Sequence, residues 1–160
     1  MDVFTYHAAD EAATDRLGAA LADLLPGGSV VALCGTLGAG KTRLVQAVAE
    51  AEGVDRRSVV SPTFVLVQPY QGRRWIYHLD AYRLRDEDEF LQLGPEEYFE
   101  SDGLTFVEWA DRVQGAMPRD RLEIQIEVTG PETRRFAIRA YGERYAELIP
   151  RLQSRLAGSA

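Results

Sequence analysis

The spacing of hydrophobic and polar residues along the chain predicts alternating helices and strands. Apolar residues recur at helical spacing over residues 10–25, and Pro26-Gly27-Gly28 ends that helix. Residues 30–34 form a short β-rich apolar run without polar alternation, which is typical of a strand buried on both faces of a parallel sheet. A glycine-rich turn follows, and the next helical pattern covers residues 40–52. This order of elements favours an α/β protein.

The second half of the chain predicts two hairpins. Residues 64–70 and 74–79 are β-rich and flank a short polar turn, and residues 122–128 and 135–139 form a second such pair. Residues 104–107 form a further strand. The remaining expected segments are helices or turns at 86–93, 96–99 and 110–113, and a final amphipathic helix with Tyr145, Leu148, Ile149, Leu152 and Leu156 on one face.

We find no linker, internal repeat or low-complexity segment, so residues 1–160 are expected to form one domain. Its expected fold class is α/β, with a mixed, mostly parallel central sheet flanked by helices.

Composition narrows the possible functions. The 160 residues include 18 basic and 25 acidic side chains, giving a net charge of −7, so strong direct binding of nucleic acid by this chain alone is not expected. The single cysteine, Cys34, and two distant histidines make no metal-ligand set. The N-terminus lacks the pattern of a signal peptide, and no apolar run is long enough to span a membrane. A cytoplasmic protein is therefore expected.

The strongest motif is a phosphate-binding loop that fits G-x-x-x-x-G-K-[ST] without a mismatch. Its residues are Gly35, Thr36, Leu37, Gly38, Ala39, Gly40, Lys41 and Thr42. Glycines allow a tight turn, and the backbone amides from Gly38 to Arg43 would lie at a helix N-terminus, where an anion is favoured. Lys41 can reach the β- and γ-phosphates, and the Thr42 hydroxyl can bind Mg²⁺. The motif predicts a P-loop domain that binds a nucleoside triphosphate.

Lys41 is the only lysine, and the other 17 basic residues are arginines. A tight loop needs a slim, flexible ammonium group rather than a planar guanidinium. The single lysine of the chain therefore stands at a position where an arginine would not serve. A guanine-specific Asn-Lys-x-Asp motif would need a second lysine, and therefore ATP is favoured over GTP by elimination.

Two acidic residues are candidates for the second Mg²⁺ group of the site. Asp80 follows the apolar run Ile76-Tyr77-His78-Leu79, and Glu108 follows Leu104-Thr105-Phe106-Val107. Periodicity does not choose between them. His78 shares strand parity with Asp80 and could orient it, although a half-buried strand histidine is the favoured interpretation.

Four blocks of sequence, in order, closely resemble the TsaE (YjeE) family, the ATPase component of bacterial tRNA threonylcarbamoyladenosine biosynthesis. They are residues 35–42, Ser61-Pro62-Thr63-Phe64, His78-Leu79-Asp80-Ala81-Tyr82-Arg83-Leu84 and Glu108-Trp109. The resemblance implies a P-loop fold, binding of ATP or ADP with Mg²⁺, and slow hydrolysis by the chain alone. It also implies action with a TsaB–TsaD heterodimer, through which tRNA is reached indirectly.

The resemblance further implies roles for individual residues. Thr42 and Glu108 would hold Mg²⁺, and Lys41 would contact the phosphates. Asp80 would be an essential acid in a mobile switch-like segment, residues 61–64 would form the other switch-like region, and Trp109 would lie beside the nucleotide. Lys41, Asp80 and Glu108 are therefore the candidate catalytic residues, whereas the base contacts near residues 129–135 are not mapped.

The resulting interpretation is a Mg²⁺-dependent ATPase, stimulated by its partners, that drives or resets a tRNA-modifying complex. Two alternatives stay open. One is a small-molecule kinase of the P-loop class, for which the sequence gives no distinct lid or basic substrate pocket. The other is a nucleotide-dependent binding module in which hydrolysis is incidental.

Overall fold

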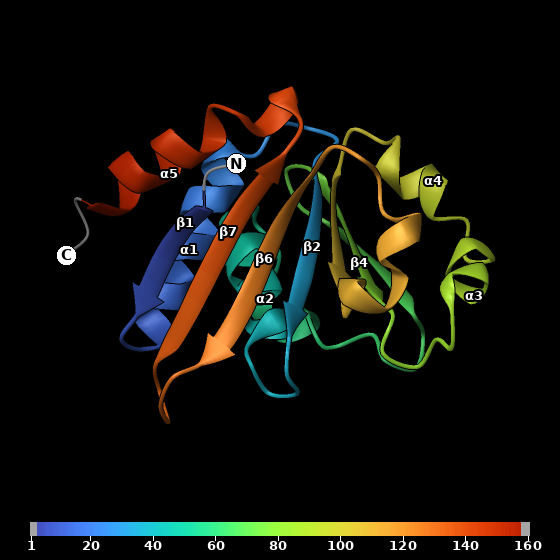
Figure 1. Ribbon diagram of the computed structural model, residues 1–160, viewed down its shortest axis with the longest axis horizontal. Helices are drawn as coiled ribbons and strands as arrows, with labels where there is room; N and C mark the ends of the chain where they lie inside the picture. Colours follow the sequence, from blue (N-terminus) through green and yellow to red (C-terminus); the bar gives the residue numbers. More distant parts are fainter. Residues whose placement is uncertain (1–2, 158–160) are drawn as a thin grey trace.

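A seven-stranded sheet with the order β1-β7-β6-β2-β5-β4-β3 forms the centre of the computed structural model, which describes residues 3–157 (Figure 1). The strands are β1 (Val3–Ala8), β2 (Val30–Gly35), β3 (Val67–Gln71), β4 (Trp75–Asp80), β5 (Leu104–Glu108), β6 (Arg121–Val128) and β7 (Arg134–Tyr141). The helices are α1 (Glu11–Leu24), α2 (Lys41–Ala51), α3 (Glu87–Leu91), α4 (Pro95–Phe99) and α5 (Leu148–Ala157). Short 3-10 helices are η1 (Arg56–Ser58), η2 (Ala110–Ala116) and η3 (Glu143–Tyr145).

The middle of the sheet is parallel and its two sides are antiparallel. Strand β2 pairs in parallel with both β5 and β6, and β5 pairs in parallel with β4. Strands β3, β7 and β1 add antiparallel pairs outside this centre. The predicted α/β class with a mixed sheet flanked by helices is therefore confirmed, with the parallel pairing confined to the middle strands.

Helices cover both faces of the parallel centre, which explains the uninterrupted apolar run in β2. Val31 and Leu33 pack in the core on the side of α1, α2 and α5, whereas Val30, Ala32 and Cys34 pack on the side of α3, α4 and η2. Figure 1 shows α1 and α2 together behind the sheet. A strand buried on both faces needs apolar residues at every position.

Helices α1 and α2 pack very closely, and this contact fixes the helix that follows the phosphate loop. A Cβ atom built at Gly18 would lie 2.3 Å from the Cβ atom of Ala47, so only glycine allows this approach. The start of α1 is capped by Asp10, whose side chain accepts a 2.8 Å hydrogen bond from the Ala13 amide.

Several expected boundaries were wrong. Strand β1 was not predicted, because its edge position leaves it half exposed and weakens the apolar signal. Strand β3 begins at Val67 rather than at residue 64, because residues 63–66 form a turn in which Leu66 has a φ of 71°. Tyr145 lies in η3 ahead of α5, where its hydroxyl accepts a 3.1 Å hydrogen bond from the Val30 amide.

Within residues 3–157, none of the helices combines the length and the apolar character that crossing a membrane would require.

Candidate functional site

The glycine-rich loop connects the end of β2 to the start of α2, next to the centre of the sheet. Gly38 and Gly40 have φ angles of 78° and 113°, which L-residues with a side chain rarely adopt. The Leu44 amide donates to the Gly40 carbonyl at 3.0 Å, so the amides of the three preceding residues lie in the first turn, where a helix supplies no acceptor. The loop therefore presents backbone donors at a helix N-terminus, as phosphate binding requires.

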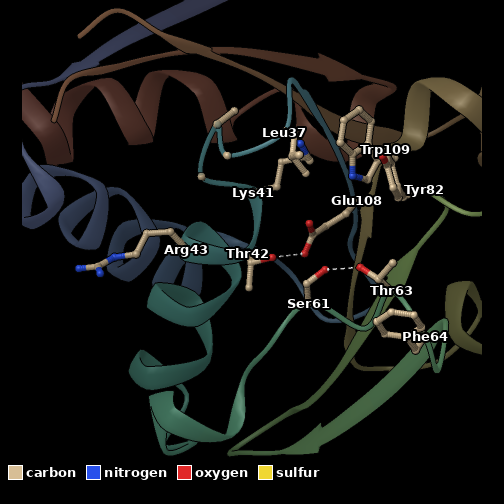
Figure 2. Close-up of a pocket in the computed structure, with 13 residues that line it drawn as sticks. Leu37, Lys41, Thr42, Arg43, Ser61, Thr63, Phe64, Tyr82, Glu108 and Trp109 are labelled. Carbon is tan, nitrogen blue, oxygen red and sulfur yellow. Dashed lines mark hydrogen bonds between the residues drawn. The ribbon is translucent and has the colours of Figure 1, made fainter. Parts of the chain in front are cut away.

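A cavity of about 460 Å³ opens above this loop (Figure 2). It is lined by Leu37, Gly38, Ala39, Gly40, Lys41, Thr42, Arg43, Ser61, Thr63, Phe64, Tyr82, Glu108 and Trp109. The loop residues predicted to bind the cofactor thus share one cavity with Glu108 and Trp109, except Gly35 and Thr36, which lie at the base of the loop and do not line it.

Lys41 lies inside the loop rather than in solvent. Its side chain is 4% exposed, and its Nζ atom donates 2.9 Å hydrogen bonds to the carbonyls of Gly35 and Thr36. The ammonium also lies 3.9 Å from the ring centroid of Trp109. Burial lowers the pKa of Lys41, and the nearby carboxylates, with Glu108 first among them, act in the opposite direction.

Glu108 lies at the end of β5 and reaches the start of α2. The Thr42 hydroxyl donates a 2.7 Å hydrogen bond to Oε2 of Glu108, as the dashed line in Figure 2 shows. A hydroxyl and a carboxylate are hard oxygen ligands of the type that Mg²⁺ takes alongside water and phosphate oxygens. Within residues 3–157 no group of three or more His, Cys, Asp or Glu residues could hold a metal ion. The oxygen chemistry of Thr42 and Glu108 fits Mg²⁺ that takes its remaining ligands from water and a nucleotide.

His78 does not have the environment that the sequence indicated. It is fully buried rather than half-buried, and its Nε2 atom lies 2.5 Å from Oε2 of Glu108, so its partner is not Asp80. Side chains two residues apart on a strand lie on the same face, so the sequence already indicated that His78 shares a face with Asp80. The identity of its partner depended on the neighbouring strand, which the sequence did not reveal.

Asp80 anchors the segment predicted to be switch-like. Its Oδ2 atom accepts 3.0 Å hydrogen bonds from the hydroxyls of Ser61 and Thr63, and its Oδ1 atom accepts a 2.8 Å bond from the Tyr82 amide. The same segment carries Phe64, which belongs to the cavity lining yet is 83% exposed. Asp80 thus ties residues 61–63 to the end of β4.

The Trp109 side chain lies over the phosphate loop, whereas the Arg43 side chain is directed toward α1. Trp109 has a φ of 59°, and its ring lies over Lys41 and 4.9 Å from the ring of Tyr82. The Arg43 side chain instead points away from Thr42 and Glu108 and forms ion pairs with α1, at 3.1 Å to Glu11 and 3.2 Å to Asp15. Its contribution to a phosphate site would therefore come from its backbone amide.

A second cavity, of about 230 Å³, lies on the other side of the loop. It is lined by Glu11, Thr14, Gly38, Ala39, Gly40, Arg43, Pro131, Glu132, Arg134 and Phe136. Arg134 belongs to β7, and its Nε atom donates a 2.9 Å hydrogen bond to the Ala39 carbonyl. Both cavities are lined by Gly38, Ala39 and Gly40, so the second one lies directly beside the predicted phosphate site. Pro131, Glu132 and Arg134 fall in the stretch 129–135, where the resemblance had placed base contacts without mapping them, whereas the wall from α1 had no sequence signal.

A buried strand, the loop G-x-x-x-x-G-K-T and a helix in direct succession define the chain as a P-loop domain. Comparison with known proteins is more specific. The family model described as "Threonylcarbamoyl adenosine biosynthesis protein TsaE" matches residues 8–136. The chain therefore belongs to the TsaE family, as the four sequence blocks had predicted.

Individual relatives agree with this assignment. The tRNA threonylcarbamoyladenosine biosynthesis protein TsaE of Bacillus subtilis is 41% identical over 126 residues, covering 78% of each chain. The protein of the same name from Streptomyces coelicolor is 41% identical over 141 residues, covering 82% of this chain and 93% of the relative. A crystal structure of YdiB from Bacillus subtilis superposes with a TM-score of 0.80 at 30% identity, covering 96% of this chain and 95% of the other.

Proposed function

We propose that this protein binds and hydrolyses ATP with Mg²⁺ in the cytoplasm, and that it drives or resets a TsaB–TsaD complex during tRNA threonylcarbamoyladenosine biosynthesis. Membership of the TsaE family supports the pathway. The observation that carries the chemical part is one cavity in which a buried lysine, the Thr42 hydroxyl and the Glu108 carboxylate meet around the glycine loop.

The two cavities suggest how ATP lies on the protein. The phosphates occupy the larger cavity, over the amides of residues 38–43, and the Lys41 ammonium exchanges its two carbonyl acceptors for phosphate oxygens. The nucleoside occupies the smaller cavity, whose walls come from α1 and from the connection between β6 and β7. Pro131, which is exposed, supplies apolar surface there for a base, with the buried Phe136 behind the cavity wall.

Thr42 and Glu108 are the residues that would hold Mg²⁺. When bound, the ion neutralises charge on the β- and γ-phosphates during phosphoryl transfer. The protein's own contribution is positioning, because the loop amides and Lys41 form a fixed array of positive partial charges around the phosphates. Trp109 packs over Lys41 and against Tyr82, and both rings form part of the wall of this cavity.

Asp80 couples the nucleotide state to the partner in this proposal. Its two oxygen atoms accept three hydrogen bonds, and two of these bonds come from hydroxyls of the switch-like segment. Three of the roughly four acceptor positions of the carboxylate are taken in this way, so Asp80 meets an attacking water fully only when Ser61 or Thr63 moves. Asp80 therefore links any rearrangement at the γ-phosphate to the position of the segment that carries the exposed Phe64.

The Asp80→Asn variant tests this link. An amide keeps an acceptor for Tyr82 but removes the negative charge that holds two hydroxyls. We expect ATP binding to persist and partner-stimulated hydrolysis to fall at least tenfold. An Asp80→Asn variant with full stimulation would remove Asp80 from the mechanism.

Phosphate release, measured with and without TsaB–TsaD and tRNA, tests the function as a whole. Slow release that increases with the partners supports an ATPase of the complex. A phosphorylated small molecule would instead indicate a kinase, and repeated rounds of tRNA modification supported by a non-hydrolysable analogue would indicate a binding module. The net charge of −7 is consistent with partners that present the tRNA while this chain handles ATP.

A further inference from the structure

His78 is a buried polar residue that the proposed phosphate chemistry does not itself use. It lies two residues before Asp80 on β4, and its side chain is fully buried. Strand β4 runs parallel to β5 with Asp80 opposite Glu108, so both strand ends reach the same edge of the sheet. The imidazole Nε2 atom lies 2.5 Å from Oε2 of Glu108.

The direction of this hydrogen bond follows from the chemistry of the two groups. An ionised carboxylate only accepts, so Nε2 carries the proton and donates it to Glu108. The Thr42 hydroxyl donates to the same oxygen at 2.7 Å. Oε2 is therefore held between a donor fixed in the core and a donor at the start of α2. Among residues 3–157, Oε1 of Glu108 has no hydrogen-bond partner and is left for water or a cation.

The other ring nitrogen argues against a purely structural role. Nδ1 of His78 is buried without a hydrogen-bond partner among the described residues. A buried polar atom without a partner is unfavourable, and an apolar side chain would fill the same space without it. Ile76, two residues earlier on the same face of β4, shows that the core there accepts an aliphatic residue.

We propose that His78 is a positioning residue that holds the Glu108 carboxylate in the orientation needed for Mg²⁺. This inference rests on the proposed Mg²⁺–ATP binding and deepens it. By fixing Oε2, the imidazole keeps the carboxylate beside Thr42 and directs Oε1 toward the cation and its water. Partners behind a metal ligand act in this way on ligand geometry and affinity.

The test measures how much Mg²⁺ strengthens binding of a non-hydrolysable ATP analogue. Calorimetry with Mg²⁺ and with EDTA gives two affinities, and their ratio is the Mg²⁺ gain. We expect His78→Leu to reduce this gain about 10- to 100-fold, or to abolish it if the wild-type gain is smaller. His78→Gln retains most of the gain, because its amide nitrogen lies near the position of the imidazole Nε2.

Two controls separate positioning from a general loss of structure. Tyr70→Phe removes another buried polar atom, from the strand paired with β4, and its ring lies 6.2 Å from the His78 ring. We expect this variant to keep the wild-type gain. Combining His78→Leu with Glu108→Gln should weaken Mg²⁺ binding no further than Glu108→Gln alone, because both changes act through one carboxylate.

Each outcome decides one proposal. An unchanged gain in His78→Leu, or an equal loss in Tyr70→Phe, would overturn the positioning role. A wild-type protein without any Mg²⁺ gain would overturn the proposed function itself. If His78→Leu fails to fold, His78→Gln is compared with His78→Asn, whose amide nitrogen corresponds to Nδ1 and does not reach Glu108. Equal gains in that pair would also overturn the positioning role.

Discussion

Replacing Lys41 with methionine removes the one ammonium group at the glycine loop while keeping a side chain of similar length. In the structure this group donates two 2.9 Å hydrogen bonds to loop carbonyls. In the proposed complex it donates to the β- and γ-phosphates instead. Two charge-assisted hydrogen bonds contribute about 1.5–3 kcal/mol each. Because the free protein already makes two bonds to neutral carbonyls, only the surplus of the phosphate bonds, about 1.5–3 kcal/mol in total, is lost from binding, and ATP affinity falls about 10- to 10²-fold.

The stability of the fold should respond very differently. Burial lowers the pKa of Lys41 from 10.5, so the folded chain disfavours the charged form relative to the unfolded chain. This unfavourable contribution is fully present below the folded pKa and disappears as the pH rises past 10.5. At pH 7 the variant loses the two hydrogen bonds of Lys41, but it also avoids the free-energy cost of burying a charged group, and the two effects oppose each other. We expect its free energy of unfolding to stay within about 1 kcal/mol of wild type.

The assay combines calorimetric titration with ATP and urea unfolding of the same samples at pH 7. Arg57→Met is the matched control, since it removes one positive charge from a side chain that is 90% exposed and outside the site. Its ATP affinity should equal that of wild type. Binding by Lys41→Met within threefold of wild type would refute the phosphate role of Lys41, and a loss of folding together with binding would refute the stability argument.

Three further predictions concern the scaffold. Tyr145→Phe leaves the Val30 amide without its acceptor and should lower the free energy of unfolding by about 1–2 kcal/mol in urea. Gly18→Ala places a Cβ atom 2.3 Å from Ala47 and should cost about 1–3 kcal/mol in the same measurement, whereas an equally stable variant would contradict the close helix contact. Burial acts to raise the pKa of Asp15, but two arginine partners outweigh it and lower the pKa below 3.8. The stability difference between wild type and Asp15→Asn should therefore be full above pH 3.8 and vanish as the pH falls through the lowered pKa.

The sequence predicted well the elements whose pattern lies within one short stretch of chain. The run before Gly35 is apolar at every position because both faces of β2 are covered, and the loop can be recognised because glycine, lysine and threonine each meet a local requirement. Strand β1 was missed because an edge strand has one exposed face and little apolar content. The resemblance had placed base contacts near residues 129–135, but the wall contributed by α1 was missed because Glu11 and Arg134 are 123 positions apart in the sequence and meet only in the fold.

The sequence by itself determined the phosphate loop and two acidic strand ends, Asp80 and Glu108, because these depend on short stretches of chain. The residue pattern alone did not decide which acid lies beside Thr42; the family resemblance implied Glu108, and the tertiary structure gives the physical reason. That choice follows from the strand order β2-β5-β4, which puts β5 directly next to the strand that carries the loop. Glu108 therefore reaches Thr42, whereas Asp80, one strand further away, holds the segment at residues 61–63. The same order brings His78 against Glu108, a contact that exists only because two strands 30 residues apart lie side by side.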